Sequence, residues 1–315
     1  MKTKIVILGA TGFIGKNLVN FFAKKNQYQV WAVYNSKKKF FNKNVKWLKA
    51  NLLVQKNVSK VLKKADIVIQ AAATTSGSKD IVNEPYLHVT DNAIMNSIIL
   101  REILKYEIKH FIFFSCTVML PSKNKKITET DLNLNDEINP KYYGVAWTKL
   151  YIEKMCKFYS SISKTKFTII RHSNIYGPHD KFDLEKSHVF GATVTKVMTS
   201  NKSITIWGNG EESRDLLYVD DLVNFVFKAI NLQKLKFRIY NCGLGKGVKI
   251  KDLVKKIIKI SNKNLVINFD ISKPTIPSKV YLNCELAKKE INWKPSVSLE
   301  TGIKKTINWW KKNIK

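Results

Sequence analysis

Acidic residues are scarce in this chain. Its 315 residues include 24 Asp and Glu against 55 Lys and Arg, a formal net charge of +31. A strongly basic chain can be a nucleic-acid binder. Here, however, the basic residues are scattered over the whole length, with one triplet at 37–39 and no patch interleaved with aromatics. We therefore do not expect nucleic acid as a partner, although a positive field would attract an anionic dinucleotide or nucleotide sugar.

Long hydrophobic runs and paired cysteines are also missing. No apolar run approaches twenty residues, so no membrane-spanning helix is expected. The first apolar run, 5–8, is short and ends in a glycine-rich turn, which does not predict a signal peptide. The four cysteines form no CxxC pair, which argues against a zinc site or a disulfide framework and favours a reducing cytoplasm. Hydrophobic residues, at 44% of the chain, suffice for one large α/β domain or for such a domain with a small lobe.

A glycine-rich turn follows the first predicted strand, 4–8, and precedes an amphipathic helix that is predicted to run to about residue 25. Gly9, Gly12 and Gly15 have the spacing GxxGxxG. Gly9 makes a tight turn, Gly12 lets the backbone approach a pyrophosphate, and Gly15 lets the helix pack on the strand. The helix N-terminus then offers free N–H groups to phosphate. This position between a first strand and a first helix predicts a dinucleotide site rather than a plain connecting turn.

No acidic residue ends the second predicted strand, 30–34. An NAD site usually has Asp or Glu there to bond the ribose 2′-hydroxyl. The chain has Asn35, Ser36 and Lys37 instead, followed by Lys38. These side chains can donate to a 2′-phosphate, which a carboxylate would repel. We therefore predict NADP(H) as the cofactor in preference to NAD(H).

The glycine spacing resembles the extended short-chain dehydrogenase/reductase family. Within that family the chain resembles the GDP-fucose synthases, which are epimerase–reductases of nucleotide sugars. The likeness is carried by the loop 174–188 after a predicted strand at 167–171, by the segments 207–221, 270–279 and 293–303, and by a Ser–Cys pair at a strand end. It covers essentially the whole chain. It implies an α/β fold with a Rossmann-type doubly wound parallel sheet and a small C-terminal α/β substrate lobe.

The same resemblance implies a division of the chain and a set of cofactor contacts. Residues 1–170 would form the NADP-binding domain, its sheet completed by later segments, and 171–315 mainly the substrate lobe. Around the glycine turn, Thr11, Phe13 and Ile14 would join the three glycines. Small residues after the fourth strand would let a dinucleotide lie across its end. The further implied contacts are Asn51, Leu52, Ala71, Ala73, Asn92, Lys149, His172, Asn174 and Ile175.

Proton transfer is assigned to Cys116 and His188. GDP-fucose synthases place a Cys directly after a Ser at the end of the fifth strand, and Ser115–Cys116 matches this arrangement. A thiolate can remove a proton beside a ketone if nearby positive charge lowers its pKa. His188 would return a proton on the opposite face. Because a 4-keto sugar has acidic protons at C3 and C5, one such pair could invert both centres. A buried structural thiol and a solvated loop histidine are the alternatives.

Reduction in this family requires a Tyr four residues before a Lys, and that Tyr is missing. Val145 stands four residues before Lys149. A two-residue bulge at the start of the helix could return Tyr143 to the site. Otherwise Tyr142 or Ser115 would supply the general acid, or it is absent. Lys149 remains a ribose ligand.

Substrate contacts are implied along the second half of the chain. Ser115 or Thr117 would bond the carbonyl oxygen of the sugar, and Asn174 and His188 lie in the substrate loop. Downstream, Lys196 would contact the nucleotide phosphates, Trp207 would pack on the sugar or base, and Arg214 would pair with the diphosphate. The alternatives are that Trp207 is an ordinary buried aromatic residue and that the two basic residues are ordinary surface residues.

We predict a cytoplasmic enzyme that epimerises a GDP-linked 4-keto sugar beside its ketone and reduces C4 with NADPH. One alternative is an NAD-dependent nucleotide-sugar 4-epimerase, dehydrogenase or dehydratase, prompted by Val145. Another is a non-catalytic Rossmann-type binding protein, prompted by the charge and the altered signature. The resemblance also implies a homodimer joined by the helices near 92–105 and 145–160. No metal is expected.

Overall fold

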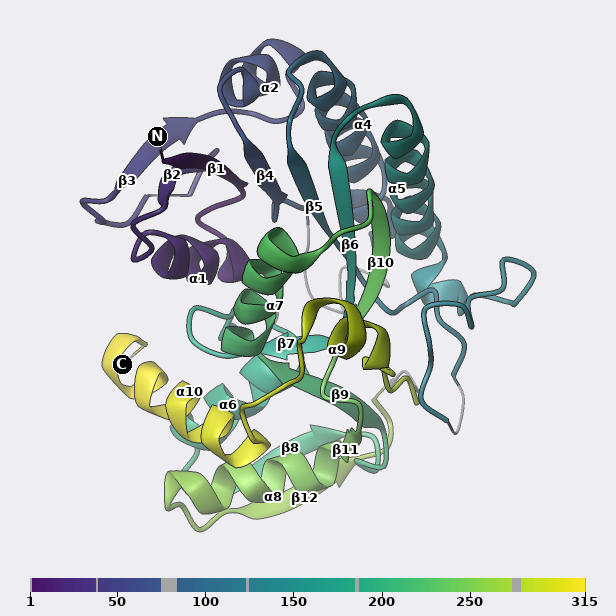
Figure 1. Ribbon diagram of the computed structural model, residues 1–315. Helices are drawn as coiled ribbons and strands as arrows, with labels where there is room; N and C mark the ends of the chain where they lie inside the picture. The colour runs from purple at the N-terminus through teal and green to yellow at the C-terminus, as the bar shows by residue number, and fades with distance from the viewer. Residues whose placement is uncertain are drawn as a thin grey trace.

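The computed structural model describes residues 2–37, 39–74, 84–122, 125–184, 187–273 and 279–314. A seven-stranded sheet forms its centre, and every neighbouring pair in that sheet is parallel (Figure 1). The Rossmann-type α/β fold is therefore confirmed. From one edge to the other the strands are β10 (Phe237–Cys242), β6 (Lys166–His172), β5 (His110–Ser115), β4 (Ile67–Gln70), β1 (Thr3–Leu8), β2 (Tyr28–Tyr34) and β3 (Val45–Lys49).

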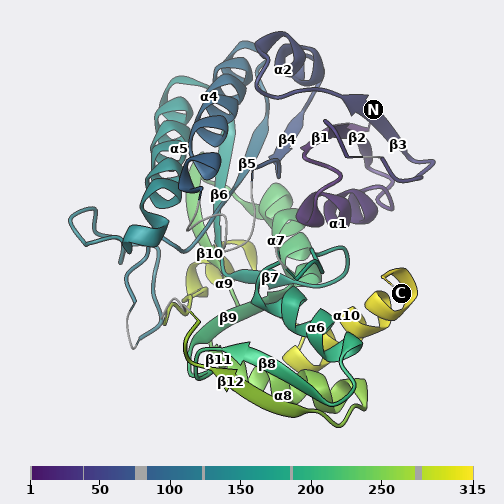
Figure 2. The same cartoon turned by 180° about the vertical axis from the view of Figure 1, so that it is seen from behind.

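Helices cover both faces of this sheet because its strands are hydrophobic on both sides. Ile5 and Ile7 of β1 belong to the core beneath α1 and α7, and Val6 and Leu8 belong to the core beneath α2, α4 and α5. Figure 2 shows α4 and α5 lying side by side along the sheet. The helices are α1 (Phe13–Phe22), α7 (Val219–Leu232), α2 (Gln55–Leu62), α4 (Thr90–Lys105) and α5 (Tyr143–Ile162).

The strand order creates a switch point between β1 and β4. From β1 the chain moves outward to β2 and β3, and then returns to β4 on the other side of β1. Leu8 at the end of β1 pairs with Val33 of β2 and with Gln70 of β4, so these three strands end together. A ligand binds in the crevice that such a reversal opens at the carboxyl ends of parallel strands. The glycine turn after β1 therefore lies where a dinucleotide is expected.

The second half of the chain builds a smaller α/β lobe below the sheet (Figure 1). It holds a three-stranded sheet, a parallel two-stranded sheet and four helices, although α7 and β10 return to the large domain. Two 3₁₀ turns, η1 (Pro85–His88) and η2 (Pro140–Tyr142), precede α4 and α5. The lobe elements are β7 (Asn174–Tyr176), β9 (Ser213–Tyr218), β11 (Gly247–Lys249), β8 (Ser203–Trp207), β12 (Val266–Asp270), α6 (Val189–Thr199), α8 (Ile250–Ser261), α9 (Glu285–Ile291) and α10 (Leu299–Asn313).

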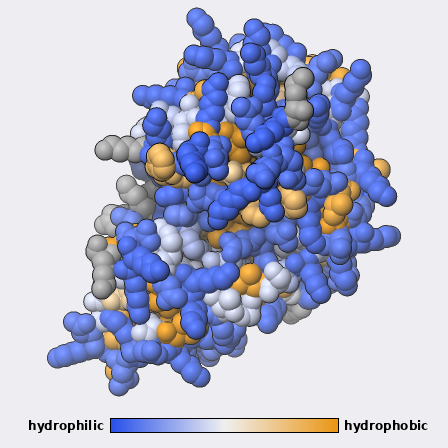
Figure 3. All heavy atoms as spheres, turned by 60° about the vertical axis from the view of Figure 1, so that its left-hand side comes forward, coloured by the Kyte–Doolittle hydropathy of each residue, from blue (hydrophilic) through white to orange (hydrophobic). Residues whose placement is uncertain are grey.

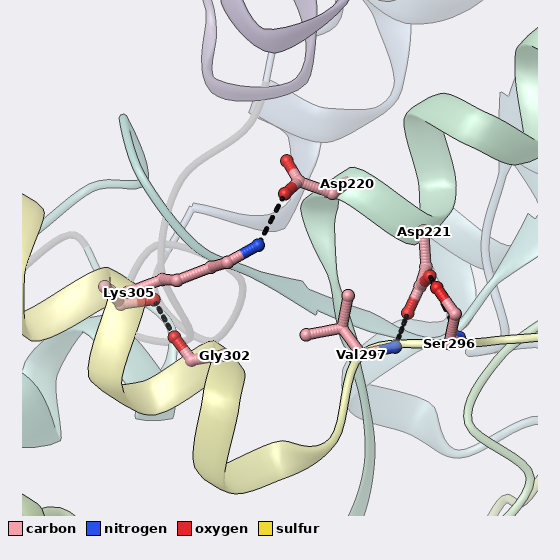
Figure 4. Close-up of polar contacts among 7 residues, drawn as sticks. Asp220, Asp221, Ser296, Val297, Gly302 and Lys305 are labelled. Carbon is pink, nitrogen blue, oxygen red and sulfur yellow. Dashed lines mark hydrogen bonds and ion pairs between the residues drawn. The ribbon is translucent and has the colours of Figure 1, made fainter.

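A buried carboxylate fastens the C-terminal segment to α7. Asp221 accepts hydrogen bonds from the Ser296 amide at 3.0 Å, the Ser296 hydroxyl at 2.8 Å and the Val297 amide at 3.0 Å (Figure 4). The neighbouring Asp220 forms only an exposed ion pair with Lys305 at 3.4 Å. Asp221 is 2% exposed, so its charge is held by these three donors. The attachment positions α10 against the lobe.

Hydrophilic side chains dominate the face that carries β3, α1 and α10, and hydrophobic residues appear on it in separate patches (Figure 3). This agrees with lysines that are dispersed along the sequence rather than gathered in one segment. Among the described residues, no helix has both the length and the apolar character needed to span a bilayer.

Candidate active site

The turn after β1 has no room for side chains at two of its glycines. Gly9 has φ +73°, and a Cβ there would lie 2.6 Å from the Ala72 Cα. A Cβ on Gly15 would collide with the Gly9 carbonyl oxygen and lie 2.9 Å from the Ala10 Cα. The Gly12 amide donates to the Gly9 carbonyl at 3.0 Å, which closes the turn. These contacts give Gly9 and Gly15 the roles that the spacing predicted.

The N-terminus of α1 is open. Gly12 is its N-cap, no side chain caps the helix, and no acidic residue occupies its first turn. Its free N–H groups and the positive end of its dipole therefore face the cavity beyond the turn. A pyrophosphate fits this donor set, so the residues present suit a dinucleotide.

A cavity of about 290 Å³ extends from this turn along the ends of β1, β2 and β4. The residues after β2 line it, and no carboxylate stands among Asn35, Ser36 and Lys37. Lys38 lies outside the described residues. The cavity also has lining residues that the sequence does not single out: Val33, Tyr34, Ala50, Leu53, Ala72, Thr74, Asp91 and Met95. The predicted residues that line it are Gly9, Thr11, Gly12, Asn35, Ser36, Lys37, Asn51, Leu52, Ala71 and Ala73.

Several predicted cofactor residues have structural roles. Asn92 lines neither cavity, because its carboxamide bonds the Thr74 amide and carbonyl, both at 3.0 Å, and the His88 carbonyl at 2.9 Å. It therefore joins the segment after β4 to α4, a correction to the expected cofactor contact. Phe13, Ile14 and Ile175 pack their side chains against the hydrophobic core.

A second cavity, of about 390 Å³, lies at the ends of β5 and β6. Three predicted substrate residues line it, namely Thr117, Asn174 and Arg214, and so does Tyr142. Arg214 comes from β9 in the small lobe, so both parts of the chain contribute walls. The segments 118–122 and 137–140 and Val280 complete the lining.

Ser115 does not face this cavity. Its hydroxyl donates to Glu153 at 2.6 Å, and Glu153 forms a buried ion pair with Arg171 at 2.7 Å. Arg171 also donates to the Glu129 carbonyl at 3.0 Å. Ser115 is fully buried in this network. The structure therefore does not support its predicted catalytic contact and leaves Thr117, two residues later, as the hydroxyl at the cavity.

Cys116 follows β5, where the Lys149 side chain reaches the strand end. The Lys149 ammonium donates to the Phe114 carbonyl at 2.8 Å and stands 4.7 Å from the centre of the Phe113 ring. Burial raises the pKa of the Cys116 thiol, and the nearby charge of Lys149 opposes that rise without overcoming it. Cys116 is therefore a neutral thiol at neutral pH. Its predicted role in proton transfer stays a prediction.

Two histidines continue the group toward the small lobe. His172 at the end of β6 contacts the Ser173 carbonyl through Nδ1 at 2.8 Å. Burial lowers the pKa of His172 to about 4, and the charge of Lys149 adds to this effect. His172 is therefore neutral at neutral pH. His188 is the N-cap residue of α6 and is exposed to solvent.

Tyr143 is turned away from both cavities. It is the first residue of α5, is 60% exposed, and packs edge-on to Trp147 with ring centres 6.2 Å apart. The helix continues unbroken from Tyr143 to Ile162, so no bulge brings this ring to the site. The preceding Tyr142 lines the second cavity instead. The sequence predicts Tyr143 as the general acid, but α5 begins at this residue and leaves its ring at the surface.

Lys196 and Trp207 line neither cavity among the described residues. The Lys196 ammonium donates to the Thr205 carbonyl at 2.9 Å, which joins α6 to β8. Trp207 ends β8 and is 49% exposed. Their predicted nucleotide contacts remain predictions. Of the predicted segment 270–279, residues 274–278 lie outside the described part of the chain.

The chain is similar over nearly its whole length to nucleotide-sugar enzymes. GDP-L-colitose synthase of Yersinia pseudotuberculosis is 28% identical over 314 residues, which cover 98% of this chain and 97% of that protein. A GDP-L-fucose synthase of Sinorhizobium fredii is 27% identical over 273 residues, covering 84% and 86%. UDP-glucose 4-epimerase of Thermotoga maritima, solved with UDP-glucose, superposes with a TM-score of 0.88 at 25% identity, covering 99% and 100%.

A family model described as the NAD dependent epimerase/dehydratase family matches residues 5–243. The match contains the glycine turn, both cavities' principal residues and all of the predicted catalytic residues. The protein is accordingly an NAD(P)-dependent nucleotide-sugar epimerase or oxidoreductase. By the extent of this match, the chain belongs to the NAD dependent epimerase/dehydratase family.

Proposed function

We propose that this enzyme epimerises a GDP-linked 4-keto sugar beside its ketone and reduces the carbonyl at C4 with NADPH. The observation that carries the proposal is the arrangement at the ends of β5 and β6. Cys116 follows β5, and the Phe114 carbonyl holds the Lys149 ammonium there at 2.8 Å. His172 ends β6, the strand paired with β5, and His188 caps α6, the next helix along the chain. We assign the two proton transfers to Cys116 and His188.

Proton transfer at the carbon beside a ketone needs one group that accepts and one that donates. The neutral Cys116 thiol can donate a proton, given the direction in which its pKa moves, and the exposed imidazole of His188 can accept one. These starting states reverse the roles expected from the sequence. Inversion at both C3 and C5 would use the same two residues in turn.

The cofactor is the second part of the proposal. A bound nicotinamide dinucleotide would supply the hydride for the carbonyl carbon. Asn35, Ser36 and Lys37 line the cavity after β2, where a ribose 2′-phosphate would lie, and they offer donors without a carboxylate. This favours NADPH. Lys149, held by the Phe114 carbonyl, would meet the nicotinamide ribose.

Incubation of the purified protein with NADPH and GDP-4-keto-6-deoxymannose in deuterated water tests the reaction. We expect loss of NADPH fluorescence together with deuterium at C3 and C5 of the product. Heat-inactivated protein is the control. If neither NADPH oxidation nor deuterium uptake occurs, this substrate is rejected.

A UDP-sugar 4-epimerase is the second candidate, favoured by the structural likeness to the Thermotoga maritima enzyme. Such an enzyme would recycle its cofactor. It would release bound NAD on denaturation and interconvert UDP-sugars without net NADPH consumption. Detection of both would replace the GDP-keto-sugar proposal.

We also infer that two copies pair through α4 and α5. One face of α5 exposes large hydrophobic side chains along its whole length, and Ile94 and Leu104 of α4 are 45% and 40% exposed. Contiguous exposed apolar surface of this kind marks an interaction site. The side chains on α5, each between 37% and 60% exposed, are Tyr143, Trp147, Tyr151, Phe158 and Ile162.

A further inference from the structure

We propose that Tyr142 is the proton donor to the reacting carbonyl oxygen, in place of the tyrosine that position 145 lacks. The inference rests on the proposed reduction step and names a residue for it. Tyr142 lines the second cavity together with Thr117, Asn174 and Arg214. Among the described residues, no other tyrosine lines that cavity.

Tyr142 lies just before α5. It is the last residue of η2 and the N-cap residue of α5, so its position follows from the 3₁₀ turn and not from the periodicity of the helix. Val145, four residues before Lys149, has no polar side-chain atom to offer. Tyr142 is the tyrosine of this segment whose side chain lines the second cavity.

A 3₁₀ turn holds the residue in this position. The Tyr142 amide donates to the Asn139 carbonyl at 2.8 Å, and the Asn139 side chain accepts from the Lys141 amide at 3.1 Å. Pro140 begins the turn, where its lack of an N–H costs nothing. The backbone leaves the turn at Tyr142 and enters α5 at Tyr143. Of the two consecutive tyrosines at this junction, Tyr142 lines the cavity and Tyr143 does not.

Electrostatics connect Tyr142 to the proton-transfer group. Burial raises the pKa of the Tyr142 phenol, the positive charge of Arg214 opposes this, and Cys116 adds to it. Cys116 is therefore within electrostatic reach of both Tyr142 and Lys149. A phenol that stays protonated suits proton donation to an oxygen that gains charge.

Tyr142 would donate its proton as the carbonyl is reduced. As the carbonyl carbon receives a hydride from the reduced nicotinamide dinucleotide, the electron pair of the C=O π bond moves to oxygen. The O–H bond of Tyr142 breaks, and its proton forms the new O–H bond of the sugar. The phenolate that remains regains a proton from solvent. Thr117, from the neighbouring strand end, can donate a hydrogen bond to the same oxygen.

The test compares Tyr142→Phe with Tyr143→Phe, which removes the adjacent hydroxyl. Each variant is assayed for NADPH oxidation and, separately, for deuterium uptake at C3 and C5. We expect Tyr142→Phe to slow NADPH oxidation by about 10²–10⁴-fold while deuterium uptake continues. Tyr143→Phe should retain both. Circular dichroism verifies that each variant is folded.

The outcomes separate this proposal from the proposed function. Deuterium uptake without NADPH oxidation in the wild type, or equal rates in Tyr142→Phe and the wild type, would overturn the role of Tyr142. If the wild type shows neither activity, the substrate is rejected, and phenolate absorbance of the NADP⁺ complex decides about Tyr142. We then expect one phenol whose titration shifts on NADP⁺ binding to disappear in Tyr142→Phe only. Its persistence in that variant would overturn the assignment.

Discussion

At the scale of single residues, the dinucleotide turn depends on the absence of two Cβ atoms. Gly9 and Gly15 are bounded by backbone atoms, which cannot move aside as flexible side chains can. Gly12 has more space, since its nearest neighbour to a new Cβ is 3.3 Å away. The three glycines of the motif therefore differ in what a substitution would cost.

We expect Gly15→Ala to lower the free energy of unfolding by about 1–3 kcal/mol, because α1 must move away from the turn. Gly12→Ala is the control and should cost less than about 1 kcal/mol. Urea denaturation of both variants measures the difference. Equal stability of Gly15→Ala and the wild type would show that the turn can relax around a methyl group.

Asp180, in the loop that leads to His188, is a buried carboxylate with one oxygen that makes no hydrogen bond. Burial raises the pKa of Asp180 to about 7, while a bond from the Lys181 amide opposes the rise. Since this folded-state pKa exceeds the ordinary value of 3.8, folding favours the protonated form. The fold therefore loses stability as pH rises from about 4 through about 7.

Asp180→Asn cannot ionise, so its stability relative to the wild type should increase over that interval. The gain should stay below about 4 kcal/mol, the value of a three-unit pKa difference. Urea denaturation at about pH 4.5 and about pH 8 measures it. Asp131→Asn is the control, because hydrogen bonds from Thr128 lower the pKa of Asp131 to about 2 and its ionisation is complete at both pH values. A gain for Asp180→Asn that does not change with pH would contradict the expectation.

At the scale of secondary-structure elements, buried polar contacts decide how the C-terminal segment is attached. Asp221 at the start of α7 receives three hydrogen bonds from residues 296 and 297, just before α10. Gly302 of α10 packs against the Tyr176 ring, where a Cβ would not fit. The C-terminal segment is therefore attached by the carboxylate of Asp221 and by the close packing of Gly302 on Tyr176.

We expect Asp221→Ala to destabilise the protein by about 2–4 kcal/mol, because three buried donors lose their acceptor. Asp220→Ala removes only an exposed ion pair and should change stability by less than about 1 kcal/mol. Thermal unfolding measures both, and hydrogen exchange should show faster opening of α10 in Asp221→Ala. Similar losses in the two variants would mean that the neighbouring charges contribute equally.

At the scale of the whole molecule, α5 has two faces with different tasks. One packs on the sheet and holds Lys149 near the cofactor side, and the other exposes the aromatic and aliphatic stripe of the proposed dimer. A self-complementary helix face suits a twofold pair. Pairing would place the site on one side of the helix and the partner on the other.

Replacement of Phe158 and Ile162 by Glu should convert the dimer into a monomer, because charges would be buried without partners in the interface. The control is Leu232→Glu, which alters an exposed hydrophobic residue of α7 outside the stripe. Light scattering after size-exclusion chromatography gives the mass. A wild type that is monomeric at micromolar concentration would remove the dimer proposal.

Much of the fold could be read from the sequence because its signals are local. Each of these features is recognisable from a few consecutive residues. They are the glycine turn, the β-branched strand at 167–171 and the small residues after β4. The sequence predictions fail for side chains whose hydrogen-bond partner is distant in the sequence. Ser115 was predicted at the substrate, but Glu153, 38 residues later, takes its hydroxyl. The sequence predicts Asn92 at the cofactor, but its carboxamide bonds Thr74 after β4 and the His88 carbonyl.

The parallel α/β fold, the glycine turn and the kinds of side chain at the strand ends all follow from the sequence, because hydrophobic periodicity and backbone freedom specify them locally. Tertiary structure decided which of those side chains reach the cavities and in what protonation state. Burial, which depends on contacts between distant segments, keeps the Cys116 thiol neutral. The helix start, set by the turn at Pro140, brings Tyr142 to the cavity and leaves Tyr143 at the surface.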